Sequence, residues 1–321
     1  MTPAGRRYGI TVPFDGVPLH RHRAWLEELA ALGYTDAWSA EVDGVDGFTP
    51  LALAAAWTPG LRLGVAVAPA FTRGPALLAQ TAAAMAEAAP GRFTLGIGAS
   101  SPVVVERWNG IPYADPYHRV RDTLRFLRAA LAGEKVTADY PTFSVRGFRL
   151  SRPVEQPPPV HVAALRPGML RLAGREADGV VLNWLAADDV PTALAEVGPG
   201  KEVVARIFVV PLDDVATARA VGRRMITAYL TVPAYAAFHR WLGRGPALRA
   251  MWEAWDAGDR RAALAAVPDE VVDALVVHGG PEACRRHVAR YVANGVTVPV
   301  LQVVPAGVDL AEAVRGLAPT G

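Results

Sequence analysis

The stretch RFTLGIGASSPVVVERWNGIPYADPYHRVR, residues 92–121, carries the clearest indication of the fold. In it an apolar run, residues 93–97, is followed at once by Gly98, Ala99, Ser100 and Ser101. The run predicts a buried parallel strand, and α/β proteins bind ligands where such strands end. Small residues there let a flat ring or a phosphate approach the backbone. Glycines in this pattern also relieve crowding inside a closed barrel, so the rest of the chain has to decide between the two interpretations.

Outward from this stretch, short apolar runs alternate with helix-length amphipathic segments along nearly the whole chain, as a parallel βα repeat requires. We predict eight strands, at residues 8–12, 35–39, 61–68, 93–98, 160–164, 179–183, 203–210 and 298–304. Helices are predicted at residues 19–32, 49–57, 75–89, 117–132, 167–175, 190–197, 216–229, 281–294 and 310–317. This order predicts an α/β TIM (β/α)8 barrel that forms one domain over residues 1–321. An open Rossmann-like sheet is the alternative, but its GxGxxG fingerprint is broken because the run from Gly96 ends in Ser101.

Two segments exceed what a minimal barrel needs. Residues 133–160 contain the alternating stretch KVTADYPTFSVRGFRL, which predicts a hairpin after the fourth strand, at the edge of the barrel mouth. Residues 232–277 hold Trp241, Trp252 and Trp255 at helical spacing. We expect these aromatic side chains to form the core of a helical excursion before the eighth strand.

Composition excludes several classes of protein. The 321 residues are 51% hydrophobic and carry a formal net charge of +2, so there is no field that would attract nucleic acid. The single cysteine, Cys284, excludes a disulfide within the chain and is expected to be a helix packing residue. The beginning of the chain lacks a signal peptide and no apolar run could span a bilayer, so we expect a cytoplasmic protein without a membrane partner. The seven histidines show neither HExxH nor a cysteine partner, so we expect no metal.

Two polar positions at predicted strand ends point to chemistry. Glu41 follows the second strand, where a carboxylate can meet a substrate and act as a general acid. A loop carboxylate bonded to backbone N–H groups explains Glu41 equally well. After the fifth strand, Arg166 precedes a helix that starts at Pro167, and a helix N-terminus beside a guanidinium is a ready phosphate site.

Several aromatic and polar residues also follow predicted strands. They are Phe14 after the first strand, Trp108 and Asn109 after the fourth, and Asn183 and Trp184 after the sixth. Because these strand ends meet at one face of a barrel, we predict a large pocket lined by rings, suited to a small organic substrate.

Five segments in order resemble a known family. They are WSAEVDGVDGFTPLALAA (38–55), LGVAVAPAFTRGP (63–75), RFTLGIGASSPVVVERWNG (92–110), VHVAALRPGMLRLAGREADGVVLNW (160–184) and HGGPEACRRHVARYVANGV (278–296). The whole chain resembles the bacterial-luciferase-like superfamily of flavin and deazaflavin oxidoreductases. It is most similar to the actinobacterial branch that depends on coenzyme F420.

The resemblance implies a TIM barrel whose cofactor lies across the C-terminal mouth. It implies a nonprolyl cis peptide between Ala66 and Val67, a ring contact made by Ala66, Val67 and Pro69, and a homodimer that pairs through outer helices. The isoalloxazine and ribityl chain would lie along Gly98, Ala99, Ser100 and Ser101. The phosphate would bind the loop Ala164, Leu165, Arg166, Pro167 and Gly168, the same place as the helix-terminus argument indicates.

One departure from the family bears on the reaction. Sugar-phosphate dehydrogenases of this superfamily place a catalytic His after the second strand and a Glu after the fourth, where this chain has Glu41 and Ser101. The resemblance therefore implies hydride transfer from reduced F420 to an activated C=C, C=N or carbonyl, with Glu41 as proton donor. The alternatives are an FMN-dependent monooxygenase and a non-catalytic flavin-binding or structural subunit.

Overall fold

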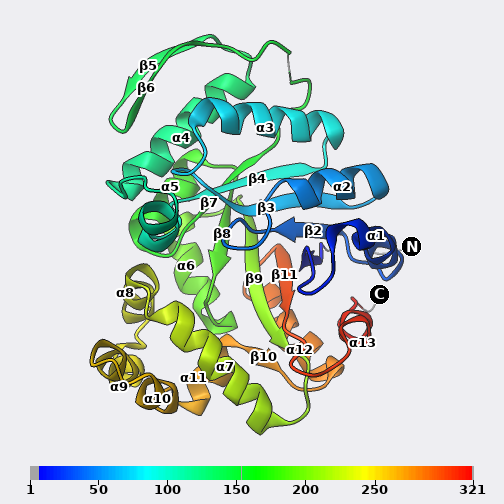
Figure 1. Cartoon of the computed structure of the whole chain (residues 1–321), viewed down its shortest axis with the longest axis vertical. Coiled ribbons are helices and arrows are strands. Elements are labelled where there is room, and N and C mark those ends of the chain that lie inside the picture. Colours follow the sequence, from blue (N-terminus) through cyan, green and yellow to red (C-terminus); the bar gives the residue numbers. More distant parts are fainter. Residues whose placement is uncertain (1–6, 153, 320–321) are drawn as a thin grey trace.

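The computed structural model describes residues 7–152 and 154–319. Within them, eight parallel strands pair in chain order and the last returns to the first, so the sheet closes into a barrel (Figure 1). The strands are β1 (Gly9–Thr11), β2 (Asp36–Ser39), β3 (Arg62–Pro69), β4 (Phe93–Gly98), β7 (Val160–Ala163), β8 (Gly179–Asn183), β9 (Glu202–Val210) and β11 (Val298–Val303). A short strand, β10 (Val277–His278), adds to the end of β9. The TIM barrel predicted from the sequence is confirmed, with strand bounds within two residues of those expected.

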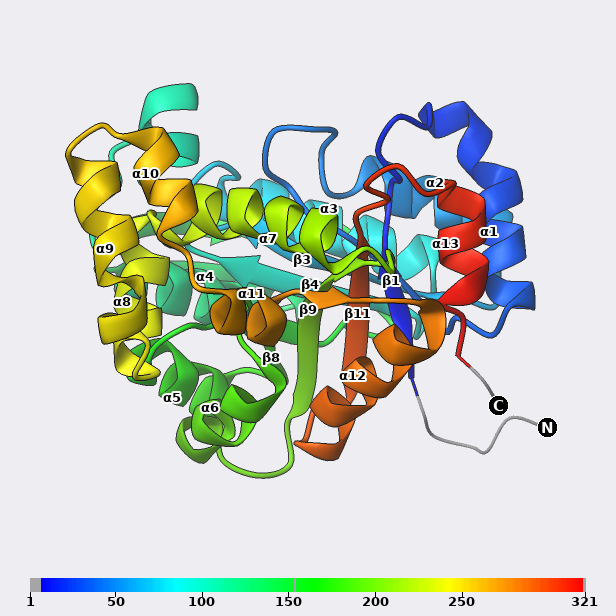
Figure 2. The same ribbon diagram turned by 90° about the horizontal axis from the view of Figure 1, so that it is seen from below.

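Helices surround the barrel, as Figures 1 and 2 show. They are α1 (His22–Ala31), α2 (Thr49–Trp57), α3 (Pro75–Ala88), α4 (Pro116–Leu131), α5 (Pro167–Glu176), α6 (Val190–Val197), α7 (Val215–Leu230), α12 (Pro281–Ala293) and α13 (Leu310–Gly316). Pro75, Pro167 and Pro281 each stand at the first helical position, where the missing N–H costs no hydrogen bond. The first and last helices lie side by side in Figure 2, and the Tyr34 hydroxyl after α1 donates to the Val314 carbonyl of α13 over 2.8 Å.

The core has an inner and an outer part, because successive side chains of a barrel strand point to opposite faces. Inside the barrel, Trp38, Val181, Val204, Val298 and Val300 pack together. Outside, the alternate residues of the strands pack against the helices in one continuous apolar cluster. Cys284 belongs to this outer layer; it is buried, and burial raises the pKa of its thiol to about 12, as befits the packing role expected from sequence.

The hairpin insertion is confirmed. It consists of β5 (Val136–Tyr140) and β6 (Phe143–Phe148), which pair with each other and not with the barrel. In Figure 1 it lies outside α3 and α4. Its tip reaches back toward the mouth, where Arg119 of α4 donates to the carbonyls of both Thr142 in the tip and Ala70 at the end of β3.

The helical excursion is also confirmed. It comprises α8 (Pro233–Trp241), α9 (Gly245–Asp256), α10 (Arg260–Ala265) and α11 (Asp269–Leu275), gathered at the side of the barrel opposite α1 and α13 (Figure 2). These helices and α7 enclose a second apolar cluster, in which Trp252 is buried and its indole N–H donates to the Leu230 carbonyl over 2.9 Å. Trp241 and Trp255 are half-buried at the edges of the two clusters. Among the described residues, no helix combines the length and the apolar character needed to cross a bilayer.

Candidate active site

A bulge in β3 shapes the mouth of the barrel. The register between β3 and β4 shifts between Val65 and Ala68, and the Ala66–Val67 peptide is cis, as the family resemblance implies. The two glycines of β4 make room for this bulge: a Cβ on Gly96 would stand 2.2 Å from the Val65 carbonyl oxygen, and one on Gly98 would stand 2.7 Å from Val67. The glycines therefore relieve crowding against the β3 bulge, as one of the two interpretations expects, and the approach of a ring or a phosphate to them stays a prediction.

The residues after β4 form an open turn. Gly98 is buried, whereas Ala99, Ser100 and Ser101 are half-buried, and Ser100 has a φ of 62°. A left-handed backbone is uncommon for a residue other than glycine and marks places where geometry is imposed by the surroundings. A single π-helical segment, Val103–Trp108, follows the turn. Such segments are rare and occur frequently at functional sites.

The loop after β7 presents the N-terminus of α5. Arg166 is the N-cap residue with extended backbone and gives no side-chain cap, so the first N–H groups of α5 are left for another acceptor. Ala164 is buried, Leu165 and Pro167 are half-buried, and the neighbouring Arg166 and Gly168 are exposed. Nothing lies within 4 Å of a Cβ built on Gly168. The loop is thus uncovered and carries the positive charge of Arg166.

Tyr113, which the sequence did not single out, connects the two loops. Its hydroxyl donates to the Ser100 carbonyl over 3.2 Å, and its ring packs against Phe71 with centroids 5.0 Å apart. Burial raises the pKa of this hydroxyl, and the positive charge of Arg166 opposes the rise. Because β4 pairs with β7, the segments expected to hold the ribityl chain and the phosphate follow neighbouring strands at the mouth.

Glu41 lies at this rim in an ion pair with Arg73. The Arg73 guanidinium donates to both carboxylate oxygens at 2.7–3.1 Å, and the Gly47 amide donates to Oε2 over 3.0 Å. The hydrogen bond to Glu41 raises the pKa of Arg73. Arg73 also lies over the ring of Phe48, 4.5 Å from its centroid. These contacts match the sequence interpretation of Glu41 as a loop carboxylate bonded to backbone, and they add a partner that sequence did not indicate.

The five residues expected to line a pocket are not brought together. Phe14 is buried and packs against Trp25 of α1, with centroids 5.0 Å apart. Trp184 is also buried, stacked on Phe208 at 4.2 Å. Both rings fill the core because aromatic side chains of the flanking helices pack on them, Trp25 of α1 on Phe14 and Tyr229 of α7 on Trp184.

The remaining three lie at different places on the rim. Trp108 is 54% exposed, and the Asn109 side chain donates to the Val104 carbonyl over 2.7 Å and so closes the π-helical segment. Asn183 donates to the Tyr235 hydroxyl of α8 over 2.9 Å. Strand ends alone could not distinguish side chains that face the mouth from those that turn under the flanking helices.

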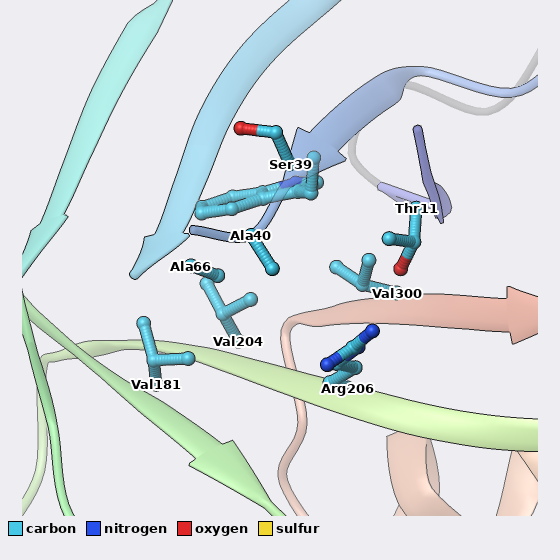
Figure 3. Close-up of a pocket in the computed structure, with 9 residues that line it drawn as sticks. Thr11, Ser39, Ala40, Ala66, Val181, Val204, Arg206 and Val300 are labelled. Carbon is cyan, nitrogen blue, oxygen red and sulfur yellow. The ribbon is translucent and has the colours of Figure 1, made fainter. Parts of the chain in front are cut away.

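A small cavity lies inside the mouth (Figure 3). Its empty space is about 230 Å³, including the part open to solvent. Its lining comes from six strands and the residue after β2: Thr11, Trp38, Ser39, Ala40, Ala66, Val181, Val204, Arg206 and Val300. Arg206 could have been noticed in the sequence, because it is the one charge inside the apolar run VVARIFVV. Among the described residues, no three His, Cys, Asp or Glu side chains gather as a metal site would require.

With the barrel and its mouth established, the sequence was compared with known proteins. A sequence model of the luciferase-like monooxygenase family matches residues 3–298. The chain belongs to this family. The match spans the barrel strands from β1 to β9, including the β3 bulge and the loops after β4 and β7, and ends at the first residue of β11.

Individual luciferase-like proteins are similar along the whole chain. A putative coenzyme F420-dependent oxidoreductase of Mycobacterium tuberculosis is 27% identical over 98% of this chain and 99% of its own length. The 5,10-methylenetetrahydromethanopterin reductase of Methanolobus tindarius is 27% identical, over 90% of this chain and 92% of its own length. Among solved structures, the coenzyme F420-dependent tetrahydromethanopterin reductase of Methanopyrus kandleri superposes with a TM-score of 0.79 at 19% identity, covering 98% of both chains. At that identity the structural match supports the fold.

Proposed function

We propose that this luciferase-like protein is an F420-dependent oxidoreductase that reduces an activated C=C, C=N or carbonyl group of a small organic substrate. The observation that carries the proposal is the uncovered N-terminus of α5 beside Arg166, placed next to the small residues after β4. Free helix N–H groups and a guanidinium suit the phosphate of such a cofactor. The names of the relatives support F420 in particular.

The residues present fit the cofactor by shape as well as charge. The β3 bulge brings Ala66 and Val67 to the mouth, and with Pro69 these residues would form one wall for a flat ring. Gly98, Ala99, Ser100 and Ser101 would lie along the chain between ring and phosphate, and Ala164 to Gly168 would hold the phosphate. When bound, F420 would supply the hydride. The protein's own contribution would be to orient the ring over the cavity and to keep its outer edge against the rim.

Glu41 remains the proposed proton donor for this reaction. It lies at the rim, on the loop between β2 and α2, but Arg73 and the Gly47 amide occupy both of its oxygens. For Glu41 to transfer a proton, Arg73 has to move away from it. A substrate that binds at the rim would displace Arg73 in this way. Arg73 is therefore proposed to control access to Glu41.

The proposed function is tested by titrating the purified, cofactor-free protein with F420 and with FMN. We expect micromolar or tighter binding of F420 and much weaker binding of FMN. Arg166→Glu should weaken F420 binding at least tenfold, because it reverses the charge beside the phosphate. Arg171→Glu, on the exposed face of the same helix, is the matched control and should leave the affinity unchanged. Preference for FMN would favour the monooxygenase alternative, and binding of neither cofactor would favour a non-catalytic subunit.

We also propose that two copies of the chain pair through α2 and α3. The sequence of α2, TPLALAAAW, contains no charged side chain although Ala52 and Ala56 are exposed, and Leu77 of the neighbouring α3 is 53% exposed. Apolar surface of this kind is typical of an interface. Leu77→Glu should shift the mass measured by light scattering from dimer to monomer. Val215→Glu, which places a charge at an exposed aliphatic position on α7, should leave the mass unchanged.

A further inference from the structure

We infer that Arg206, Thr11 and Trp38 form a carboxylate-binding subsite in the barrel cavity, so that the substrate of the proposed reduction is an organic acid. That the bound acid is the substrate rests on the proposed function, whereas the binding subsite itself is argued from the cavity alone. All three side chains line the cavity and offer hydrogen-bond donors to it. The cavity lining contains no acidic residue.

Strand register places the Arg206 guanidinium at the level of the mouth. Arg206 is opposite Val300 of β11, and Val300 is opposite Gly9 of β1, so Thr11 lies two residues further toward the mouth. The Arg206 side chain extends in that direction: its guanidinium lies 5.1 Å from the centroid of Phe208 and donates to the Gln302 side chain. Figure 3 shows it directed toward Val300 and Thr11.

The positive charge of Arg206 is not paired with a carboxylate in the part of the chain that the structure describes. No carboxylate there lies within 4.0 Å of this guanidinium, and its side-chain partner is the neutral Gln302. A half-buried cation with apolar walls around it, here Val181, Val204 and Val300, is a site where an anion gains most from pairing.

Three buried polar atoms of the lining lack a hydrogen-bond partner. They are the Thr11 hydroxyl, the Trp38 indole Nε1 and the Arg206 Nε. Trp38 is 1% exposed, so bulk solvent does not reach it. The fourth polar side chain of the lining, Ser39, is occupied because it donates to the Gly47 carbonyl. Buried polar groups are nearly always paired, and three orphans around one cavity indicate an acceptor that the chain itself does not provide. A carboxylate has two oxygens and can accept from all three.

The position in the barrel assigns this acceptor to the substrate rather than to the cofactor. The segments proposed to hold F420 follow β3, β4 and β7, which are consecutive in the closed sheet. Arg206 and Thr11 belong to β9 and β1, on the opposite arc, and of the proposed ring contacts Ala66 reaches the cavity. A ring against Ala66 would leave the Arg206 side free for a second molecule. The cavity has room for a small polar group such as the carboxylate end of this molecule, so its carbon skeleton would extend from the cavity into the mouth.

The test measures binding of benzoate and butyrate to the cofactor-free protein by calorimetry, with benzamide and butyramide as uncharged matches. We expect the acids to bind at least tenfold more tightly than the amides. Arg206→Gln should weaken acid binding at least tenfold, and Arg206→Lys should restore part of it. Thr11→Val should weaken it about threefold to tenfold without lowering stability, because the hydroxyl that it removes has no partner in the fold. Arg62→Gln, at the opposite end of a barrel strand and exposed, is the control and should change nothing.

F420 affinity of the same variants distinguishes this inference from the proposed function. We expect F420 to bind wild type and Arg206→Gln with dissociation constants within twofold of each other. A parallel loss of F420 and benzoate binding in Arg206→Gln would overturn the inference, since Arg206 would then belong to the cofactor site. Equal binding of acid and amide would also overturn it and leave the cavity to water. Discrimination in favour of acids without any F420 binding would uphold the subsite and refute the proposed function.

Discussion

The indole ring of Trp38 occupies the space that a side chain at position 64 would need: a Cβ on Gly64 would stand 2.3 Å from Trp38 Cε3. A Cβ on Gly9, on the other neighbouring strand, would meet the same ring at 3.1 Å. The largest side chain inside the barrel is thus accommodated by glycines on both sides of it. Trp38 in turn forms one wall of the cavity.

Gly64→Ala is expected to destabilise the fold by about 1–3 kcal/mol, the usual range for overpacking a core. His161 lies beside the Trp38 ring at a centroid distance of 6.5 Å and limits its movement on that side. Urea unfolding of the variant checks this, with Gly60→Ala as control because nothing lies within 4 Å of a Cβ there. Adding Trp38→Phe to Gly64→Ala should recover part of the loss, and strict additivity of the two changes would contradict the contact.

Glu41→Gln should lower kcat at least tenfold while leaving F420 affinity nearly unchanged, if Glu41 donates the proton. Arg73→Met breaks the same ion pair without removing the carboxylate, and it should leave kcat closer to wild type. Steady-state kinetics and a cofactor titration on both variants check the prediction. Equal losses of kcat in the two would instead assign Glu41 to holding the loop between β2 and α2. Glu87→Gln, in an exposed pair with Arg152, serves as the control.

Ser100→Trp should weaken F420 binding at least tenfold, because Ser100 lies half-buried in the turn where the cofactor chain is proposed to run. Thermal unfolding would show whether the fold survives a large side chain at a φ of 62°. Ser151→Trp, at an exposed position beyond the hairpin, controls for the addition of an indole. A folded Ser100→Trp protein with wild-type affinity would place the cofactor elsewhere.

Two buried histidines are expected to make the fold sensitive to acid. Burial lowers the pKa of His161 to about 4 and that of His239 to about 3, whereas an unfolded histidine titrates near 6.5. Between these values the unfolded chain binds more protons than the folded one, so stability falls as the pH decreases from about 6.5 toward 4. Each histidine contributes a slope of at most about 1.4 kcal/mol per pH unit in that window.

Urea unfolding at pH 7.5 and pH 5.0 checks this acid dependence. His239→Leu, which replaces a fully buried imidazole by an apolar group of similar size, should reduce the difference in stability between the two pH values. His118→Leu is the control, because its side chain is 40% exposed beside Asp115. The same pH difference in wild type and His239→Leu would show that His239 titrates normally in the fold.

Much of the fold followed from local pattern. The eight strands and their helices were predictable because a buried parallel strand is a short apolar run and each crossover needs an amphipathic helix. The loop after β7 was also predictable, because Pro167 after Arg166 is typical of the first position of a helix. The cis peptide at Ala66–Val67 came from family resemblance and not from any residue type in that segment.

The parts that could not be predicted depend on contacts between distant segments. Arg73 meets Glu41 across 32 positions, and the Tyr113 hydroxyl reaches the Ser100 carbonyl only because the chain folds back on the turn after β4. Phe14 and Trp184 stand at strand ends like true rim residues, yet flanking helices bury them. Arg206 faces the cavity because it lies on the inner face of β9. Which face of β9 is the inner one is decided only when β9 pairs with β8 and β11 in the closed barrel.

The separate sheet of the hairpin bears on how this protein can diverge. Because β5 and β6 pair only with each other, residues can be added, lost or exchanged there without disturbing barrel closure. The tip nevertheless touches the rim through Arg119, which joins it to the end of β3. Selection can therefore act on the entrance through the exposed side chains of a segment that lies outside the closed sheet. Related enzymes that share this barrel are free to acquire new substrate preferences in the hairpin first.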